Sequence, residues 1–163
     1  MRDILARKQG VCLDTKPMKP LTYSLFNVSK VIELSLPSRI ESVDESATFA
    51  EKVARDWGYT DDFISSIDLA VRESVANAIK HGNKFAEDKQ VLVEFADTDG
   101  AFELSVRDFG SGFDVDAIPD PTDAAHLLSS SGRGILFMRS FMDDVQWQKN
   151  EDGGTTVRMT KKK

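Results

Sequence analysis

The first half of the chain begins with two apolar patterns of different spacing. Val31 to Leu36 is a short, apolar-rich run of strand type, and Pro37 ends it. From Asp44 to Trp57, apolar residues recur at every fourth position, which is the spacing of one helix face. Gly58 follows directly and is a typical C-terminal cap. The sequence therefore predicts a strand followed by a helix.

A second helix is predicted to start after Thr60, whose side chain is a good N-cap. Asp61 and Asp62 occupy its first turn, where the helix dipole favours acids. The helical pattern runs to about His81, and Gly82-Asn83 ends it. Its apolar residues fall on one face that we expect to be buried: Ile64, Ile67, Val71, Val75 and Ala78.

The next two apolar runs predict a hairpin. Residues 91–96 form one strand, and residues 101–107 alternate so that Phe102, Leu104 and Val106 share a face. Residues 97–100 supply the turn between them. About 25 residues rich in Gly, Pro, Ser and Asp follow Asp108 without any period. Such long loops in ordered domains are commonly functional lids or disordered segments.

The C-terminal part predicts a short helix over residues 135–142 and a second hairpin. Its strands are residues 145–149 and 155–160, with the turn at residues 152–154. Helices can then cover one face of a mixed, mostly antiparallel sheet, which is a two-layer α/β sandwich. We expect one domain over residues 30–163, preceded by a loosely ordered extension over residues 1–29.

Length, charge and cysteine content narrow the class of protein. The 163 residues suffice for one domain with its own core. The net charge is −6, but the first 30 residues carry +4 and the rest −10, which argues against broad nucleic-acid binding. Cys12 is the single cysteine, so an internal disulfide and a multi-cysteine zinc site are excluded. Neither a signal segment nor a membrane-spanning run is present, so we expect a cytoplasmic protein.

Three polar residues of the second helix fall on one face. Glu73, Asn77 and Lys80 stand at i, i+4 and i+7, roughly opposite the apolar stripe. A carboxylate, an amide oxygen and an amine in line can polarise a hydroxyl, ligate Mg²⁺ and contact a phosphate. A solvated polar face is the alternative interpretation of the same three residues.

Three glycine-containing motifs follow. In the first, Asp108 ends a strand, and Gly110 and Gly112 let the backbone approach a ligand closely. In the second, Gly132, Arg133 and Gly134 form a G-x-G loop that leads into the short helix, where N–H groups favour an anion. In the third, Thr155 follows two glycines and its hydroxyl can complete a pocket for a base. Taken singly, the first and third motifs are better explained as ordinary turns, and a lone G-x-G is weak evidence.

The order of the four segments is more specific than any one of them. The segments E-x-x-x-N-A-x-K-H, D-x-G-x-G, G-x-G and G-T resemble those of the Bergerat-fold (GHKL) ATPases, a superfamily that includes DNA gyrase, MutL and the histidine kinases. The resemblance covers roughly residues 30–160. Within the superfamily the chain is most similar to the anti-sigma-factor serine/threonine protein kinases, the RsbW-type switch proteins. Glu73 stands where histidine kinases usually carry Asn.

The resemblance implies a role for each motif residue. It makes Glu73 the general base, Asn77 the Mg²⁺ ligand, and Asp108 the acceptor for the adenine amino group. The other implied ATP-binding residues are Lys80, Gly110, Gly112, Gly132, Arg133, Gly134 and Thr155. Gly82-Asn83 departs from the more apolar residues expected there, so His81 and Asn83 receive no role.

The resemblance also implies an activity and partners. The protein would be an ATP-dependent serine/threonine kinase that phosphorylates a small STAS-type antagonist and binds a sigma factor, as a homodimer. The alternative is an ATP-binding partner-switch module without significant kinase activity that controls another target. A complete histidine kinase is not expected, because no helical hairpin with an accepting histidine precedes the domain. His81 and His126 are 45 residues apart and lack partners for a metal site.

Overall fold

The protein is seen in a computed structural model whose described residues are 28–98, 100–111 and 130–163. The elements in these ranges are β1 (Val28–Pro37), α1 (Glu41–Asp56), α2 (Asp61–Asn77), the π-helix η1 (Ala78–Asn83), β2 (Gln90–Thr98), β3 (Ala101–Arg107), α3 (Ser130–Phe141), β4 (Asp144–Lys149) and β5 (Thr155–Lys162). The extension predicted over residues 1–29 and the predicted lid lie largely outside the described ranges.

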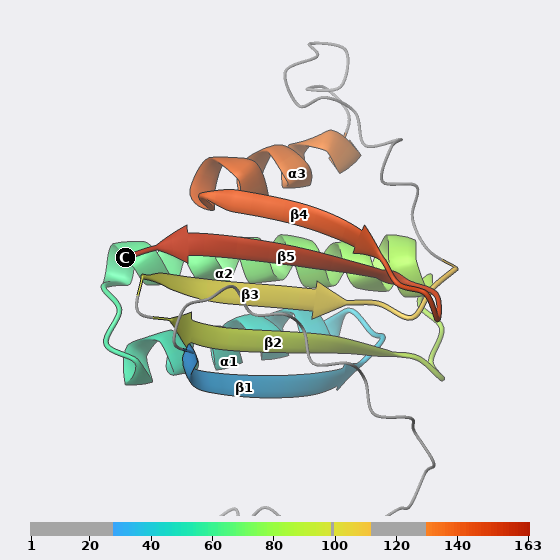
Figure 1. Cartoon of the computed structure of the whole chain (residues 1–163). Coiled ribbons are helices and arrows are strands. Elements are labelled where there is room, and N and C mark those ends of the chain that lie inside the picture. Colours follow the sequence, from blue (N-terminus) through green and yellow to red (C-terminus); the bar gives the residue numbers. More distant parts are fainter. Residues whose placement is uncertain (1–27, 99, 112–129) are drawn as a thin grey trace, which may run out of the picture.

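Five strands of the described residues form one sheet in the order β1-β2-β3-β5-β4. Each neighbouring pair is antiparallel. The hairpin β2–β3 forms the middle of the sheet, and β5 pairs with β3 so that β4 becomes an edge. The three α-helices lie on one side of this sheet (Figure 1). The predicted two-layer α/β sandwich is confirmed, although its sheet is antiparallel throughout these pairs rather than mixed.

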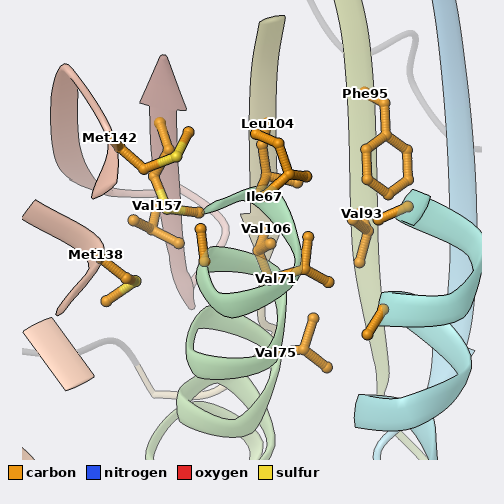
Figure 2. Packing of buried hydrophobic residues seen from close by; sticks show 14 of the residues in the cluster. Ile67, Val71, Val75, Val93, Phe95, Leu104, Val106, Met138, Met142 and Val157 are labelled. Carbon is orange, nitrogen blue, oxygen red and sulfur yellow. The ribbon is translucent and has the colours of Figure 1, made fainter. Parts of the chain in front are cut away.

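The core lies between the sheet and the helices, and α2 crosses its centre. Ile67, Val71 and Val75 are fully buried and point toward the sheet, as the four-residue spacing predicted. Figure 2 shows this stripe flanked on one side by Met138 and Met142 near α3. The buried strand residues opposite it alternate with half-buried ones in β3, which confirms the predicted face of Phe102, Leu104 and Val106.

The caps of α1 and α2 also agree with the sequence. Gly58 has φ +86°, the left-handed conformation of a C-terminal glycine, and its N–H donates to the carbonyl of Arg55. The Thr60 side chain accepts a hydrogen bond from the N–H of Phe63 at 3.4 Å. These two signals fix the α1–α2 corner and thereby the direction of α2. Within the described residues, no helix is both long and apolar enough to cross a membrane.

Several predicted boundaries differ from the structure, among them that of the first strand, which begins at Val28 and not at residue 31. The helix predicted from Asp44 begins at Glu41, three residues earlier, and the strand predicted to end at residue 96 continues to Thr98. The short helix predicted over 135–142 begins at Ser130. The glycines at 132 and 134 suggested a loop, but the helix continues through them because Met138 anchors its later turns in the core, as does Met142 directly after its end.

Candidate functional site

Three segments that are distant in sequence meet at one end of the sheet. They are the end of α2 with η1, the end of β3, and the β4–β5 turn, all on the right of Figure 1. Two hydrogen bonds join them: the N–H of Phe109 donates to the Asn83 side chain, and the N–H of Asp108 donates to the carbonyl of Thr155. The topology thus brings Asp108 and Thr155 together, as the motifs predicted.

Asp108 lies in a cradle of glycines. It is 5% exposed and directly follows β3. A Cβ atom on Gly82 would stand 2.3 Å from the Cγ of Asp108, and one on Gly154 would stand 2.1 Å from its carbonyl oxygen. Gly110 is equally constrained, since a Cβ there would stand 2.0 Å from the carbonyl oxygen of Gly82. Side chains at these positions would therefore displace Asp108 or the backbone around it.

The Asp108 carboxylate is oriented by backbone hydrogen bonds. Its Oδ1 accepts from the N–H of Gly110 at 2.9 Å. Burial raises the pKa of Asp108, and hydrogen bonds from the backbone of Gly110 and Thr155 oppose this shift. A carboxylate is an acceptor only, so the capacity that remains suits a donor such as an exocyclic amine.

Glu73 lies at the other part of the candidate site, where α2 meets α3. It is half-buried, and a Cβ atom on Gly134 would stand 2.3 Å from Glu73 Oε2. The structure therefore brings Glu73 and Gly134 into direct contact, as two motifs of one site require. Asn77 is half-buried one turn further along α2. With the described residues, the side chains of Glu73, Asn77 and Lys80 form no hydrogen bond or ion pair, so their polar groups are available to a ligand.

Lys80 does not share a regular helix face with Glu73 and Asn77. The α-helix ends at Asn77, and Ala78–Asn83 is a π-helix with a wider turn. The i+7 spacing that predicted one face for all three residues assumes a continuous α-helix. The face is correct for Glu73 and Asn77, whereas Lys80 is rotated away from the ideal position and is exposed.

The G-x-G motif lies inside the first turns of α3 and not in a loop before it. Gly132, Arg133 and Gly134 are residues three to five of the helix. The first four N–H groups of any helix lack intrahelical partners, so those of Gly132 and Arg133 remain available for an anion. The Arg133 side chain and Gly112 lie outside what the structure describes.

Two features of the site were not assigned from the sequence. Gly82 packs on Asp108, and the side chain of the buried Asn83 accepts a hydrogen bond from the N–H of Phe109, the residue after Asp108. The signal was visible as a departure from the expected pattern after His81, but nothing in the helical period pointed to a contact with residues 108–110. Arg107 also supports the site, because it donates to both carboxylate oxygens of Asp152 and closes the β4–β5 turn onto β3.

Comparisons with known proteins agree with this geometry. The model of the family described as histidine kinase-like ATPase domain matches residues 36–161. The chain belongs to this family. The match includes every described residue assigned to the candidate site.

Similar proteins within the family include serine-protein kinases called RsbW. The one from Bacillus subtilis (strain 168) is 32% identical over 141 residues, covering 83% of this chain and 87% of the relative. The one from Bacillus pumilus (strain SAFR-032) is 33% identical over 139 residues, covering 80% and 85%. A crystal structure of the RsbU and RsbW domains of a Mycobacterium tuberculosis protein matches with a TM-score of 0.60 at 20% identity, which supports the fold. That match covers 82% of this chain and 32% of the other.

Proposed function

We propose that this protein binds ATP with Mg²⁺ and transfers the γ-phosphoryl group to a serine or threonine of another protein. The observation that carries the proposal is the contact between Glu73 and Gly134, which joins a carboxylate to the N-terminal turns of a helix. The histidine kinase-like ATPase match and the serine-protein kinases at about one-third identity support the same activity.

Asp108 would recognise the adenine base. Its buried carboxylate would accept a hydrogen bond from the exocyclic amino group, and the surrounding protein keeps competing water away. Thr155 is buried beside it and would help to hold the base, while Gly110 and Gly112 would shape the pocket. A charge-assisted hydrogen bond of this kind is roughly twice as strong as a neutral one.

The phosphates would lie between α2 and the N-terminus of α3. Lys80 would offer positive charge, the backbone of Gly132 and Arg133 would offer N–H donors, and Gly134 would let the phosphates approach beside Glu73. Asn77 fits Mg²⁺ because its amide oxygen has no hydrogen-bond partner among the described residues, and Mg²⁺ commonly takes only one or two protein ligands. When bound, the ion would neutralise phosphate charge. The body of the protein, with a net charge of −10, makes such neutralisation necessary.

Glu73 would act as the general base. As the substrate hydroxyl oxygen forms its bond to the γ-phosphorus, the Glu73 carboxylate takes the hydroxyl proton, and the bond from phosphorus to the bridging β–γ oxygen breaks to release ADP. Phosphoryl transfer depends on positioning more than on covalent help, and the contact with Gly134 holds the base at the point where α3 begins.

The partners in this proposal follow the resemblance to RsbW-type switch proteins. The phosphorylated substrate would be a small STAS-type antagonist, and the kinase would also bind a sigma factor. The protein would act as a homodimer in the cytoplasm. Phosphorylation of the antagonist would then decide which of the two partners the kinase holds.

The test is phosphoryl transfer from γ-labelled Mg-ATP to a purified STAS-domain protein of the same genome. We expect labelled antagonist with the wild-type kinase and a loss of about 100-fold or more in rate with Glu73→Gln. Glu87→Gln is the matched control, because Glu87 is exposed beyond η1. ATP binding by calorimetry without any transfer would favour the binding module instead, and equal rates for wild type and Glu73→Gln would disprove the role of the base.

A further inference from the structure

The segment that ends α2 has an unusual backbone. The π-helix Ala78–Asn83 is followed by Lys84 at φ +54° and Phe85 at φ +59°, two consecutive non-glycine residues in the left-handed region. Left-handed backbone at such residues is unfavourable and persists where the surroundings enforce it. Short π-helical turns are frequent at functional sites. Some contact must therefore hold this segment in place.

Asn83 makes that contact. It is 2% exposed, and both ends of its amide are used. Its Nδ2 donates to the carbonyl of Gln90 at 2.8 Å, and its Oδ1 accepts from the N–H of Phe109 at 2.8 Å. The side chain thereby ties η1 to the first residue of β2 and to the segment after β3. A donor and an acceptor at this reach are what an asparagine amide offers.

The two ends of this connection flank Asp108. Gly82 precedes Asn83 and packs against the Asp108 side chain, while Phe109, whose N–H binds Asn83, follows Asp108. The Asn83–Phe109 hydrogen bond therefore fixes the distance between the two backbones that enclose the carboxylate. Without it, Gly82 and Asp108 would lose the constraint that keeps them in contact.

We propose that Asn83 is a positioning residue that holds the Asp108 carboxylate for base recognition and so sets the preference of the site for an adenine over a purine without the 6-amino group. This inference rests on the proposed ATP site. Among the described residues, the Asn83 side chain bonds to Gln90 and Phe109 and not to Glu73 or α3, so its effect falls on the base and not on phosphoryl transfer. The expected signature is a raised KM for ATP at nearly unchanged kcat.

Binding of ATP and of ITP tests the proposal, because ITP carries a carbonyl oxygen where ATP carries the amino group. Both Kd values are measured by calorimetry with Mg²⁺ for the wild type, Asn83→Ala and Asp108→Asn. A hydrogen bond to a charged group is worth roughly 10- to 100-fold in affinity. We expect Asn83→Ala to lower the ATP/ITP preference by about that factor, with ITP affinity changed less than about threefold.

Two further variants separate positioning from stability. Thr98→Ala removes another buried hydroxyl, which donates to the carbonyl of Ala101 at the other end of the β2–β3 hairpin. It should leave the ATP/ITP preference unchanged. Asn83→Ser keeps a hydroxyl that can bond to one of the two partners without adding a charge beside Asp108, and replaces Asn83→Ala should that variant not fold; its preference should lie between those of Asn83→Ala and the wild type.

The outcomes are distinguishable. Equal losses of ATP and ITP affinity in Asn83→Ala, or an unchanged preference, would overturn the positioning role when Asp108→Asn does lower the preference. An unchanged preference in Asp108→Asn would instead refute the proposed ATP site itself.

Discussion

Glu73 Oε2 lies so close to Gly134 that a Cβ atom there would stand 2.3 Å from it. The contact joins α2 to α3 and excludes any side chain at residue 134 while the carboxylate keeps its place. The Glu73 carboxylate is the end of a flexible side chain. A methyl group added at residue 134 would therefore displace the carboxylate more easily than the backbone. The base and the helix that follows the predicted lid are therefore mechanically connected.

Gly134→Ala is expected to slow phosphoryl transfer by at least about tenfold while leaving the protein folded. Alanine in a helix is more stable than glycine by about 0.5–1 kcal/mol, so stability should not fall. The measurement is kcat with labelled ATP, beside thermal unfolding. In a double-variant cycle, Gly134→Ala should add little to the loss already caused by Glu73→Gln, because both act on the same carboxylate. Fully additive losses would contradict the connection.

Gly82→Ala is expected to weaken ATP binding by at least about tenfold and to destabilise the fold by about 1–3 kcal/mol. Its methyl group would meet Cγ, Cβ and Oδ2 of Asp108 within 2.6 Å, and Asp108 is a short side chain that is 5% exposed. Calorimetry and denaturant unfolding measure the two effects. Gly100→Ala is the control, since nothing lies within 4 Å of a Cβ at that turn. Equal behaviour of the two variants would show that the cradle tolerates a side chain.

Much of the fold follows from local patterns. The apolar stripe of α2, the alternation in β3, Gly58 and Thr60 each act within a few residues, so the sequence predicts them. The sequence predicted that the motifs of Glu73 and Asp108 belong to one site, because the order of the four segments resembles that of the Bergerat-fold ATPases. The positions of these motifs relative to each other come from the sheet topology.

Other features depend on contacts between distant residues, and periodicity does not reveal them. The π-helix that rotates Lys80 away is stabilised through Asn83 by residues of β2 and the segment after β3. The early start of α3 reflects anchoring of Met138 in the core. In both cases tertiary packing overrides the local signal. That signal is the α-helical spacing at the end of α2 and the glycines at the start of α3.

ATP affinity is expected to fall in acid at a higher pH than an ordinary aspartate would cause. Burial raises the pKa of Asp108, so the unliganded protein takes up a proton there as the pH falls, and ATP prefers the ionised acceptor. Binding of ATP should therefore release a proton in this range. Calorimetry in two buffers of different ionisation enthalpy measures that proton. Asp108→Asn should release none, and an equal release from this variant would assign the proton to another group.

Met138→Ala is expected to lower the free energy of unfolding by about 2–5 kcal/mol, because Met138 is 1% exposed and its loss leaves a cavity under α3. Phe137→Ala is the matched control on the same helix, since Phe137 is 42% exposed and should cost less than about 1 kcal/mol. Denaturant unfolding compares the two. A Phe137 variant as unstable as the Met138 variant would mean that α3 buries a different face.

Tyr59→Phe is expected to destabilise the protein without changing ATP binding, because it acts at the opposite end of the sheet. Tyr59 donates to Asp97 Oδ1 at 2.6 Å, and Lys163 Nζ lies 2.8 Å from the same oxygen. Burial alone would raise the pKa of Asp97, but the hydrogen bonds from Lys163 and Tyr59 hold it below its ordinary value.

The stability that this ionised carboxylate contributes is present near neutral pH and is lost as the pH falls through its folded-state pKa, below about 3.8. Tyr59→Phe should therefore cost about 1.5–3 kcal/mol at pH 7 and progressively less in acid. The free energy of unfolding of the wild type and the variant is measured at pH 7 and in acid, and the Kd for ATP is measured at pH 7. A cost that is independent of pH would place the effect in aromatic packing, since the Tyr59 ring also contacts Phe63 and Phe102 with centroids 4.4 Å and 5.4 Å away.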